Sequence, residues 1–276
     1  LIGGFGGFVA GNTTERAGDT YVVFGKADWS GTQTLELSTL NGTNGFTLFG
    51  TDVDDRSGRA VSRAGDVNGD GFGDLLIGAY GGDTAGNAKP SAGESYVVFG
   101  KANWSTSPTL VLSTLNGTNG FALFGSEASD FSGFNVSGAG DVNGDGYDDL
   151  LIGAHGSDGV GNAKTDVGET YVVFGKSDWS ASPTLELSTL NGTNGFTLIG
   201  VDAGDASGFS VSGAGDVNGD GFADLLIGAL LADSVGNARP NAGETYVVFG
   251  KADWSASPTL ELSTLNGTNG FTLFGV

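Results

Sequence analysis

Hydrophobic and polar residues alternate with a period of two over short stretches of this chain, and turn residues separate the stretches. In the last quarter the alternation covers residues 209–214, 260–263 and 270–275, and residues 245–249 add an aromatic and β-branched run. Such stretches are typical of β-strands. Residues 225–229 form a continuous apolar run, as expected for a strand buried on both faces. No stretch combines a sustained 3.6-residue period with capping residues, so the pattern predicts an all-β fold.

The whole pattern returns every 75 residues, as the positions of Trp29 and Trp104 illustrate. The 276 residues therefore hold about 3.7 repeats, each with four or five short strands joined by turns. One repeat predicts one small antiparallel sheet, which cannot bury both faces alone. Stacking against the neighbouring copies solves this problem and gives a propeller or a solenoid. We divide the chain into a partial unit and three further units, namely residues 1–56, 57–131, 132–206 and 207–276.

An acidic loop precedes the continuous apolar run in three of the repeats. The third copy reads Asp216-Val-Asn-Gly-Asp-Gly-Phe-Ala-Asp224. It has oxygen-bearing side chains at loop positions 1, 3, 5 and 9, and glycine at position 6 allows a sharp turn. Calcium takes about six to eight oxygen ligands from short, flexible loops, so the spacing predicts three Ca²⁺ sites. The predicted ligands are the four side chains and the position-7 carbonyl of each loop: Asp66, Asn68, Asp70, Phe72, Asp74, Asp141, Asn143, Asp145, Tyr147, Asp149, Asp216, Asn218, Asp220, Phe222 and Asp224.

Other readings of these loops are weaker. An EF-hand needs a bidentate Glu at loop position 12, where this chain has Ile77, Ile152 and Ile227. Dockerin-type loops lead into a helix, whereas these loops lead into a predicted strand. Polar turns without a bound ion are a further alternative. Asn at position 3 reduces the ligand charge, which favours a structural role in calcium-rich extracellular fluid, with Kd of roughly 10⁻⁴ to 10⁻³ M.

Composition narrows the range of functions. The net charge of −21 argues against a nucleic-acid partner, because phosphate recognition needs a basic surface. Without cysteine, and with His155 as the single histidine, the chain lacks the parts for a zinc site or a nucleophilic triad. No apolar stretch is long enough to predict membrane insertion. Acidic residues placed identically in each repeat indicate architecture, so we expect no enzyme here, although acid–base chemistry by two Asp stays open.

Residues 208–229, which contain the third loop and the apolar run, resemble the FG-GAP repeats of integrin-α-type β-propellers. The resemblance extends over the whole chain and implies one blade of four antiparallel strands per repeat, with the calcium loop joining the first two strands. The long repeat, with its Leu-Ser-Thr-Leu-Asn-Gly segment, looks like versions in secreted or surface proteins of bacteria, especially cyanobacteria. The chain departs from the family motif at two positions. The family has Phe before the first glycine of the motif, where this chain has Ser57, Ser132 and Ser207. The family has Pro after Gly-Ala, where this chain has Tyr80, His155 and Leu230.

Ring closure poses a problem for this sequence. The resemblance implies a ring that usually has seven blades, closed by pairing strands from the two chain ends. The first unit begins at its second strand, because Leu1-Ile-Gly matches Leu76-Ile-Gly, so that unit lacks its inner strand and metal loop. Three arrangements stay open: part of a longer propeller, a strand supplied by another subunit, or an open stacked assembly.

The leading hypothesis is a calcium-stabilised extracellular or cell-surface segment for adhesion or structure, with self-assembly through unpaired blade edges as a homo-oligomer or filament. Its partner would be a protein or a glycan surface. The alternatives are a carbohydrate-binding propeller that uses the repeated Trp, and a non-catalytic scaffold of a larger enzyme. Each Trp could also pack a blade corner.

Two further groups of residues carry expectations. The four Lys three residues before each Trp are expected to pair with nearby carboxylates: Lys26, Lys101, Lys176 and Lys251. Asp residues before the first strand of their repeats predict either a further cation site or a solvated loop, the second being favoured: Asp52, Asp54, Asp55, Asp202 and Asp205.

Overall fold

The computed structural model describes residues 1–6, 14–31, 34–84, 88–234 and 239–276. These residues form β-strands, turns and short 3-10 segments, which confirms the all-β prediction. Four 3-10 segments directly follow the Thr-Leu-Glu or Thr-Leu-Val stretches: η1 (Leu37–Thr39), η2 (Leu112–Thr114), η4 (Leu187–Thr189) and η6 (Leu262–Thr264). A further segment, η3 (Val160–Asn162), follows the apolar run of the third unit. Within the described residues, no helix is long and apolar enough to cross a membrane.

The strands form four sheets that follow one another along the chain. The first contains β1 (Ile2–Gly4), β2 (Asp19–Val23), β3 (Gly45–Phe49) and β7 (Thr109–Val111). The second contains β4 (Ala60–Gly65), β5 (Asp74–Ala79), β6 (Glu94–Val98), β8 (Gly120–Phe124) and β12 (Thr184–Glu186). The third contains β9 (Asn135–Gly140), β10 (Asp149–Ala154), β11 (Glu169–Val173), β13 (Gly195–Ile199) and β17 (Thr259–Glu261). The fourth contains β14 (Ser207–Gly215), β15 (Asp224–Ala229), β16 (Glu244–Val248) and β18 (Gly270–Phe274).

The second, third and fourth units each contribute four antiparallel strands to their own blade, as predicted, and one strand to the preceding sheet, whereas the first unit contributes β1–β3. The strands β7, β12 and β17 pair in parallel with the outer strands β3, β8 and β13 of the sheets before them. The sequence predicts these short stretches as strands but not their partners. Because sheets exchange strands, the divisions at residues 57, 132 and 207 do not separate independent sheets, and as domain boundaries they stay predictions.

The hydrophobic core lies between neighbouring sheets. The strand β10 shows this, because Leu151 packs toward the fourth sheet while Leu150 and Ile152 pack toward the second, and all three are fully buried. The continuous apolar run therefore has the double burial that its pattern predicts. At Gly153 in the same run the next sheet approaches so closely that a Cβ would lie 2.0 Å from the carbonyl oxygen of Gly208. Only glycine permits this contact.

Three of the four repeated Trp side chains pack against the preceding sheet. The rings of Trp104, Trp179 and Trp254 stack on a Phe of the preceding sheet with centroids 3.5–3.7 Å apart, and all three Trp are buried: the pairs are Phe46–Trp104, Phe121–Trp179 and Phe196–Trp254. The expected pairing of the nearby Lys with carboxylates is confirmed in part: hydrogen bonds from Ser180 and Ser255 lower the pKa of Asp178 and of Asp253, and the charges of Lys176 and Lys251 add to this effect. The ammonium groups of Lys101, Lys176 and Lys251 also lie 4.0–4.3 Å from the Trp ring centroids, which makes cation–π contacts.

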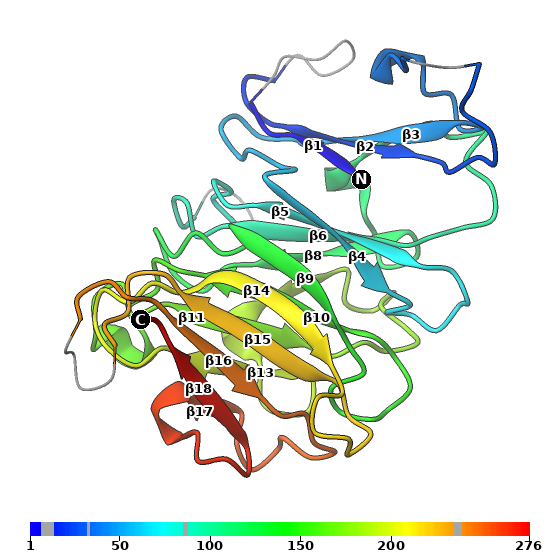
Figure 1. Cartoon of the computed structure of the whole chain (residues 1–276). Helices are drawn as coiled ribbons and strands as arrows, with labels where there is room; N and C mark the ends of the chain where they lie inside the picture. Colours follow the sequence, from blue (N-terminus) through cyan, green and yellow to red (C-terminus); the bar gives the residue numbers. More distant parts are fainter. Residues whose placement is uncertain (7–13, 32–33, 85–87, 235–238) are drawn as a thin grey trace.

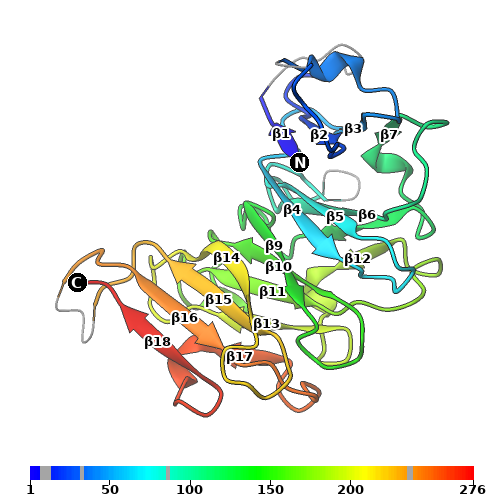
Figure 2. The same cartoon turned by 45° about the vertical axis from the view of Figure 1, so that its right-hand side comes forward.

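The four sheets form an open arc rather than a closed ring. Figures 1 and 2 show β1–β3 at one end of the arc and β16 and β18 at the other. The inner strands β4, β9 and β14 lie side by side along the middle of the arc. The prediction of β-propeller-type blades in 75-residue repeats is confirmed.

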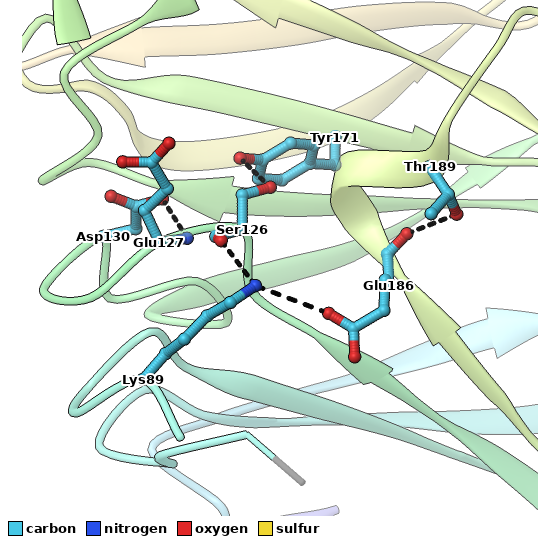
Figure 3. A network of polar contacts seen from close by, with 7 residues as sticks. All are labelled: Lys89, Ser126, Glu127, Asp130, Tyr171, Glu186 and Thr189. Carbon is cyan, nitrogen blue, oxygen red and sulfur yellow. Dashed lines mark hydrogen bonds and ion pairs between the residues drawn. The ribbon is translucent and has the colours of Figure 1, made fainter. Parts of the chain in front are cut away.

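Polar side chains also connect neighbouring sheets, at the loops before β9 (Figure 3). The Nζ of Lys89 donates to the carbonyl oxygen of Ser126 at 2.7 Å and lies 3.6 Å from a carboxylate oxygen of Glu186 in the next repeat. The hydroxyl of Tyr171 lies 3.0 Å from the hydroxyl of Ser126. The carboxylate of Asp130 beside this network is buried, with the residue 5% exposed, whereas Glu127 is exposed.

The expectation of a solvated loop before the first strand is therefore wrong for Asp55 and Asp205, and the equivalent Asp130 of the middle copy is buried as well. Asp55, Asp130 and Asp205 are all less than one-tenth exposed. Each accepts a hydrogen bond from the backbone N–H three residues earlier, at 3.0–3.2 Å. Burial is the main reason that the pKa of Asp55 and of Asp130 rises to about 7, and a nearby Glu adds to the effect.

The Trp stack predicts a position-dependent effect of one substitution. We expect Trp179→Ala to lower the free energy of unfolding by about 3–5 kcal/mol, because it empties a buried site between two sheets. Trp29→Ala is the matched control, since Trp29 has the same sequence context but is 42% exposed. It should change stability by less than about 1 kcal/mol. The measurement is urea unfolding. Equal losses of unfolding free energy in the two variants would contradict a contribution of Trp179 that depends on its contact with the preceding sheet.

The buried carboxylate of Asp130 predicts a pH-dependent gain from Asp130→Asn. Its folded-state pKa of about 7 lies above the unfolded value of about 3.9, so the folded protein binds the proton more tightly than the unfolded chain. The free energy of unfolding of wild type therefore falls as pH rises from about 4 through 7. The asparagine keeps an acceptor for the Glu127 N–H but carries no charge. We expect the free energy of unfolding of the variant at pH 8 to exceed that of wild type by at most about 4 kcal/mol, so that the variant melts at a higher temperature, and we expect the difference to shrink toward pH 4.

The comparison is made with chelator present at every pH, so that metal binding does not contribute. Asp253→Asn is the control, because hydrogen bonds from Ser255 lower the pKa of that exposed carboxyl. The control should show no gain at high pH. A gain for Asp130→Asn that does not vary with pH would contradict the assignment.

Candidate metal centres

The three acidic loops join the first two strands of their blades, as the resemblance implies. They connect β4 to β5, β9 to β10, and β14 to β15. Glycines at loop positions 4 and 6 have positive φ in all three copies, for example 76° at Gly144 and 92° at Gly146. Side chains other than glycine rarely adopt this conformation, so the two glycines let the loop fold back on itself.

Side-chain oxygens of loop positions 1 and 3 converge in each copy. In the second loop the N–H of Asp145 lies 3.0 Å from Oδ1 of Asp141 and 3.0 Å from Oδ1 of Asn143. The N–H of Gly146 donates to the other oxygen of Asp141 at 2.9 Å. The first and third loops repeat this arrangement around Asp70 and Asp220. The loop backbone thus holds the first two predicted ligands together.

The carboxylate at position 5 lies next to the side chain at position 3. Oδ2 of Asp145 accepts a hydrogen bond from the amide of Asn143 at 2.9 Å, and Oδ1 accepts the N–H of Tyr147 at 3.0 Å. Positions 1, 3 and 5 therefore present four carboxylate oxygens and one amide oxygen within one exposed turn. This donor set consists of hard oxygens, which is the chemistry that Ca²⁺ prefers. Across the described residues, however, the acidic side chains do not form a group of three or more already arranged around one ion.

The Asp at position 9 has a structural role that the sequence pattern does not reveal. Asp149 is fully buried, and its two oxygens accept the N–H of Val142 at 2.8 Å and the N–H of Gly175 at 2.9 Å. It thereby connects the start of the loop to the end of β11. Asp74 and Asp224 make the same pair of contacts. Each carboxylate oxygen keeps a further lone pair, so this role does not exclude coordination.

Burial is the main influence on the ionisation of two of these position-9 residues, Asp74 and Asp149. It raises the pKa of Asp149 to about 8 and that of Asp74 to about 6, and the negative charges at loop positions 1 and 5 act in the same direction. The backbone N–H donors oppose this rise. A divalent cation beside the loop would favour the ionised form. The residue at position 1 of the third loop shows a pKa shift in the opposite direction. The pKa of Asp216 is lowered, mainly because its carboxylate accepts a hydrogen bond from the N–H of Gly221.

Consecutive loops contact one another. The N–H of Asp66 donates to Oδ2 of Asp148 at 2.7 Å, and the N–H of Ala223 donates to the carbonyl oxygen of Asp141 at 3.0 Å. The ring of Tyr147 lies against Gly69, where a Cβ would come within 2.6 Å of the ring. Phe222 lies against Gly144 in the same way. The loops therefore form a continuous row along one end of the sheets.

The predicted ligand residues thus fall into two groups. Positions 1, 3, 5 and 7 lie together in the turn, and position 9 starts the following strand as a buried connection. The sequence spacing predicted which side chains share a loop. It did not predict the contacts between loops, because these depend on how closely the sheets stack.

Comparison with known proteins identifies the repeats. The FG-GAP repeat family matches residues 57–98, 132–173 and 207–248, each of which contains one acidic loop. Integrin alpha-IIb of Mus musculus is 31% identical over 209 residues, which cover 74% of this chain and 18% of the integrin. Integrin alpha pat-2 of Caenorhabditis briggsae is 30% identical over 168 residues, covering 59% of this chain and 12% of that protein.

A relative of a different kind is also similar over most of this chain. Phosphatidylinositol-glycan-specific phospholipase D of Dictyostelium discoideum is 31% identical over 216 residues, or 74% of this chain and 20% of that protein. The chain thus spans about a fifth or less of the length of these three relatives. The likeness to bacterial surface proteins stays a prediction. Three segments of the chain thus match the FG-GAP repeat family, and most of the chain is similar to integrin alpha subunits.

Proposed function

We propose that the chain is a calcium-stabilised, non-catalytic β-propeller repeat segment that acts outside the cell in adhesion or in a surface structure. The observation that carries the proposal is the row of three oxygen-rich loops that contact one another across the sheet junctions. The fifteen residues named as ligands from the sequence remain the proposed calcium ligands, five in each loop. The integrin relatives support an adhesion-type role with a protein partner.

Charge explains why calcium would stabilise this fold. Each loop carries three carboxylates among its proposed ligands, at positions 1, 5 and 9, and two like charges about 4 Å apart repel by roughly 4 kcal/mol at an effective dielectric near 20. Three Ca²⁺ ions would change the net charge from −21 to −21 + 6, or −15. Because each loop contacts the next, a bound ion would also hold neighbouring sheets together.

The described structure supports a structural role better than a catalytic one. The single histidine, His155, packs among the rings of Phe131, Phe134 and Phe209, and burial lowers its pKa. The phospholipase D relative is an enzyme by name, and the chain spans 20% of its length, so a scaffold within a larger enzyme stays an alternative. Sugar binding by the repeated Trp is disfavoured, because Trp104, Trp179 and Trp254 stack on Phe inside the sheet junctions.

Calcium should raise the melting temperature of the protein. At ten times Kd each site contributes about 1.4 kcal/mol, and three sites contribute about 4 kcal/mol. For a chain of this length that corresponds to a shift of about 7 °C between excess calcium and chelator, measured by calorimetry or circular dichroism. Magnesium at the same concentration is the control for ionic strength. An unchanged midpoint with calcium would exclude a stabilising metal.

Two neighbouring substitutions should separate coordination from the buried connection. Asp145→Asn keeps the Oδ1 acceptor in an exposed turn, so we expect near-normal stability in chelator and the loss of one of three calcium equivalents by isothermal titration calorimetry. Asp149→Asn places an N–H donor against a backbone N–H. It should lower stability by about 1–3 kcal/mol even in chelator. Asp178→Asn, at an exposed turn outside the loops, is the control for charge. Three calcium equivalents bound by Asp145→Asn would contradict the ligand assignment.

A further inference from the structure

The triplet Asn-Gly-Thr occurs once in each repeat, in the turn just before the strands β3, β8, β13 and β18. Its four copies begin at Asn41, Asn116, Asn191 and Asn266. In every copy both the Asn and the Thr are exposed to solvent. An Asn followed two residues later by Ser or Thr is the acceptor pattern for N-linked glycosylation, a modification of surface loops in secreted proteins. The four turns therefore have both the sequence and the accessibility of acceptor sites.

Hydrogen bonds within this turn use only one end of the first Asn side chain. The Oδ1 of Asn191 accepts the N–H of Thr193 at 2.9 Å and the hydroxyl of Thr193 at 2.7 Å. The other three copies make the same pair of bonds. Among the described residues, the Nδ2 of the first Asn donates no hydrogen bond in any of the four turns. Each turn thus leaves an amide nitrogen accessible at the surface.

The second Asn of each turn has a different role. The Oδ1 of Asn194 accepts the N–H of Asn191 at 3.0 Å, and its Nδ2 donates to the carbonyl oxygen of Thr189 at 3.3 Å. The equivalent Asn makes both bonds in the other three copies. Asn194 therefore needs an amide to hold the turn, whereas Asn191 supplies only an acceptor oxygen.

A turn that needs only an acceptor oxygen does not require Asn. In the turn that contains the repeated Trp, the Oδ1 of Asn103 accepts the N–H of Ser105 at 2.8 Å. Asp178 and Asp253 make the same contact at 2.8 Å in the next two repeats. Asp and Asn are therefore interchangeable in that turn. Turn geometry alone does not explain why all four Asn-Gly-Thr turns begin with an amide.

We propose that the first Asn of each Asn-Gly-Thr turn is an acceptor for N-linked glycosylation. The donor is a sugar whose anomeric carbon carries a phosphate or diphosphate leaving group. During transfer the bond between the anomeric carbon and the phosphate oxygen breaks, and a bond from that carbon to Nδ2 forms. Nδ2 loses one proton, and the phosphate leaves with the electron pair of the broken bond.

The attached sugars would lie beside the metal loops. Thr118 and Asn119 of the second turn line the same cavity as Asp70 of the first metal loop. Glycans at these turns would therefore extend from the end of the sheets that carries the loops, with one site in each sheet. The inference rests on the proposed extracellular role, because the acceptor pattern is used in secreted proteins, and it does not depend on calcium binding.

The structure separates these turns from a similar triplet that it makes unsuitable. Asn135-Val-Ser137 lies in β9, and the Oδ1 of Asn135 accepts the N–H of Val211 in β14 at 3.0 Å. A glycan on Asn135 would have to fit between two packed strands, so we expect this residue to be unmodified. A further triplet, at Asn103, occurs in one repeat only, and the proposal is limited to the four repeated turns.

The measurement is mass spectrometry of intact glycopeptides from the protein as its natural source produces it. We expect carbohydrate on the four proposed Asn and none on Asn135. The mass of the attached group distinguishes a preassembled oligosaccharide from a single sugar. Four unmodified turns, or carbohydrate on Asn135, overturn the proposal. Cell fractionation separates the two proposals: unmodified protein outside the cell overturns only the glycosylation, whereas protein confined to the cell interior overturns the extracellular role as well.

Two substitutions in one turn make the test specific. Asn191→Asp keeps the Oδ1 acceptor, so the protein should lose one carbohydrate group and keep its melting temperature. Asn194→Asp is the matched control, since it places a carboxylate oxygen against the carbonyl oxygen of Thr189. This variant should melt at a lower temperature and keep all four carbohydrate groups. Melting is measured on protein made in a host without N-glycosylation, so that the sugars themselves do not contribute.

Either of two results with these variants overturns the assignment. An unchanged carbohydrate mass in Asn191→Asp would mean that the sugar is attached elsewhere. An equal loss of melting temperature in the two variants would mean that the amide of Asn191 has a structural role. Calcium-dependent melting is measured separately, so failure of the glycosylation proposal leaves the calcium proposal standing.

Discussion

Each sheet in this chain is too small to bury two faces by itself, so its stability depends on contact with the sheets before and after it. The junction supplies this contact in three ways. Apolar side chains from both sheets form a shared core, a Trp stacks on a Phe of the preceding sheet, and a short strand extends that sheet in parallel. Because the Trp and the added strand come from the following repeat, a sheet is complete only when the next repeat is folded.

The metal loops belong to the same junctions. Hydrogen bonds connect Asp66 to Asp148 and Asp141 to Ala223, so each loop is positioned partly by its neighbour. The buried Asp at position 9 connects the loop to its own sheet. Ion binding at such a loop would act on stability through the sheet contacts, which is consistent with a structural rather than a signalling metal.

Much of the local structure was predictable from sequence because it depends on neighbouring residues along the chain. Alternation predicted the strands, and the apolar run from Leu150 correctly predicted burial on two faces. Loop spacing predicted that Asp141, Asn143 and Asp145 would share a turn. The charge of Lys176 suggested a carboxylate partner, but its position over Trp179 depends on the packing of the strand end. The burial of Asp55 and Asp205 was missed because polar sequence near a turn usually indicates solvent exposure.

The sequence by itself determined the 75-residue period, the strand and turn positions, and the oxygen chemistry of the loops, because backbone preference and side-chain type are local properties. Only the tertiary structure decided what each repeated residue contacts. Trp29 and Trp179 stand in the same Asp-Trp-Ser context, yet Trp29 is exposed and Trp179 is buried. The physical reason is that burial of a repeated side chain requires a preceding sheet to cover it, and the first sheet has none in this arc.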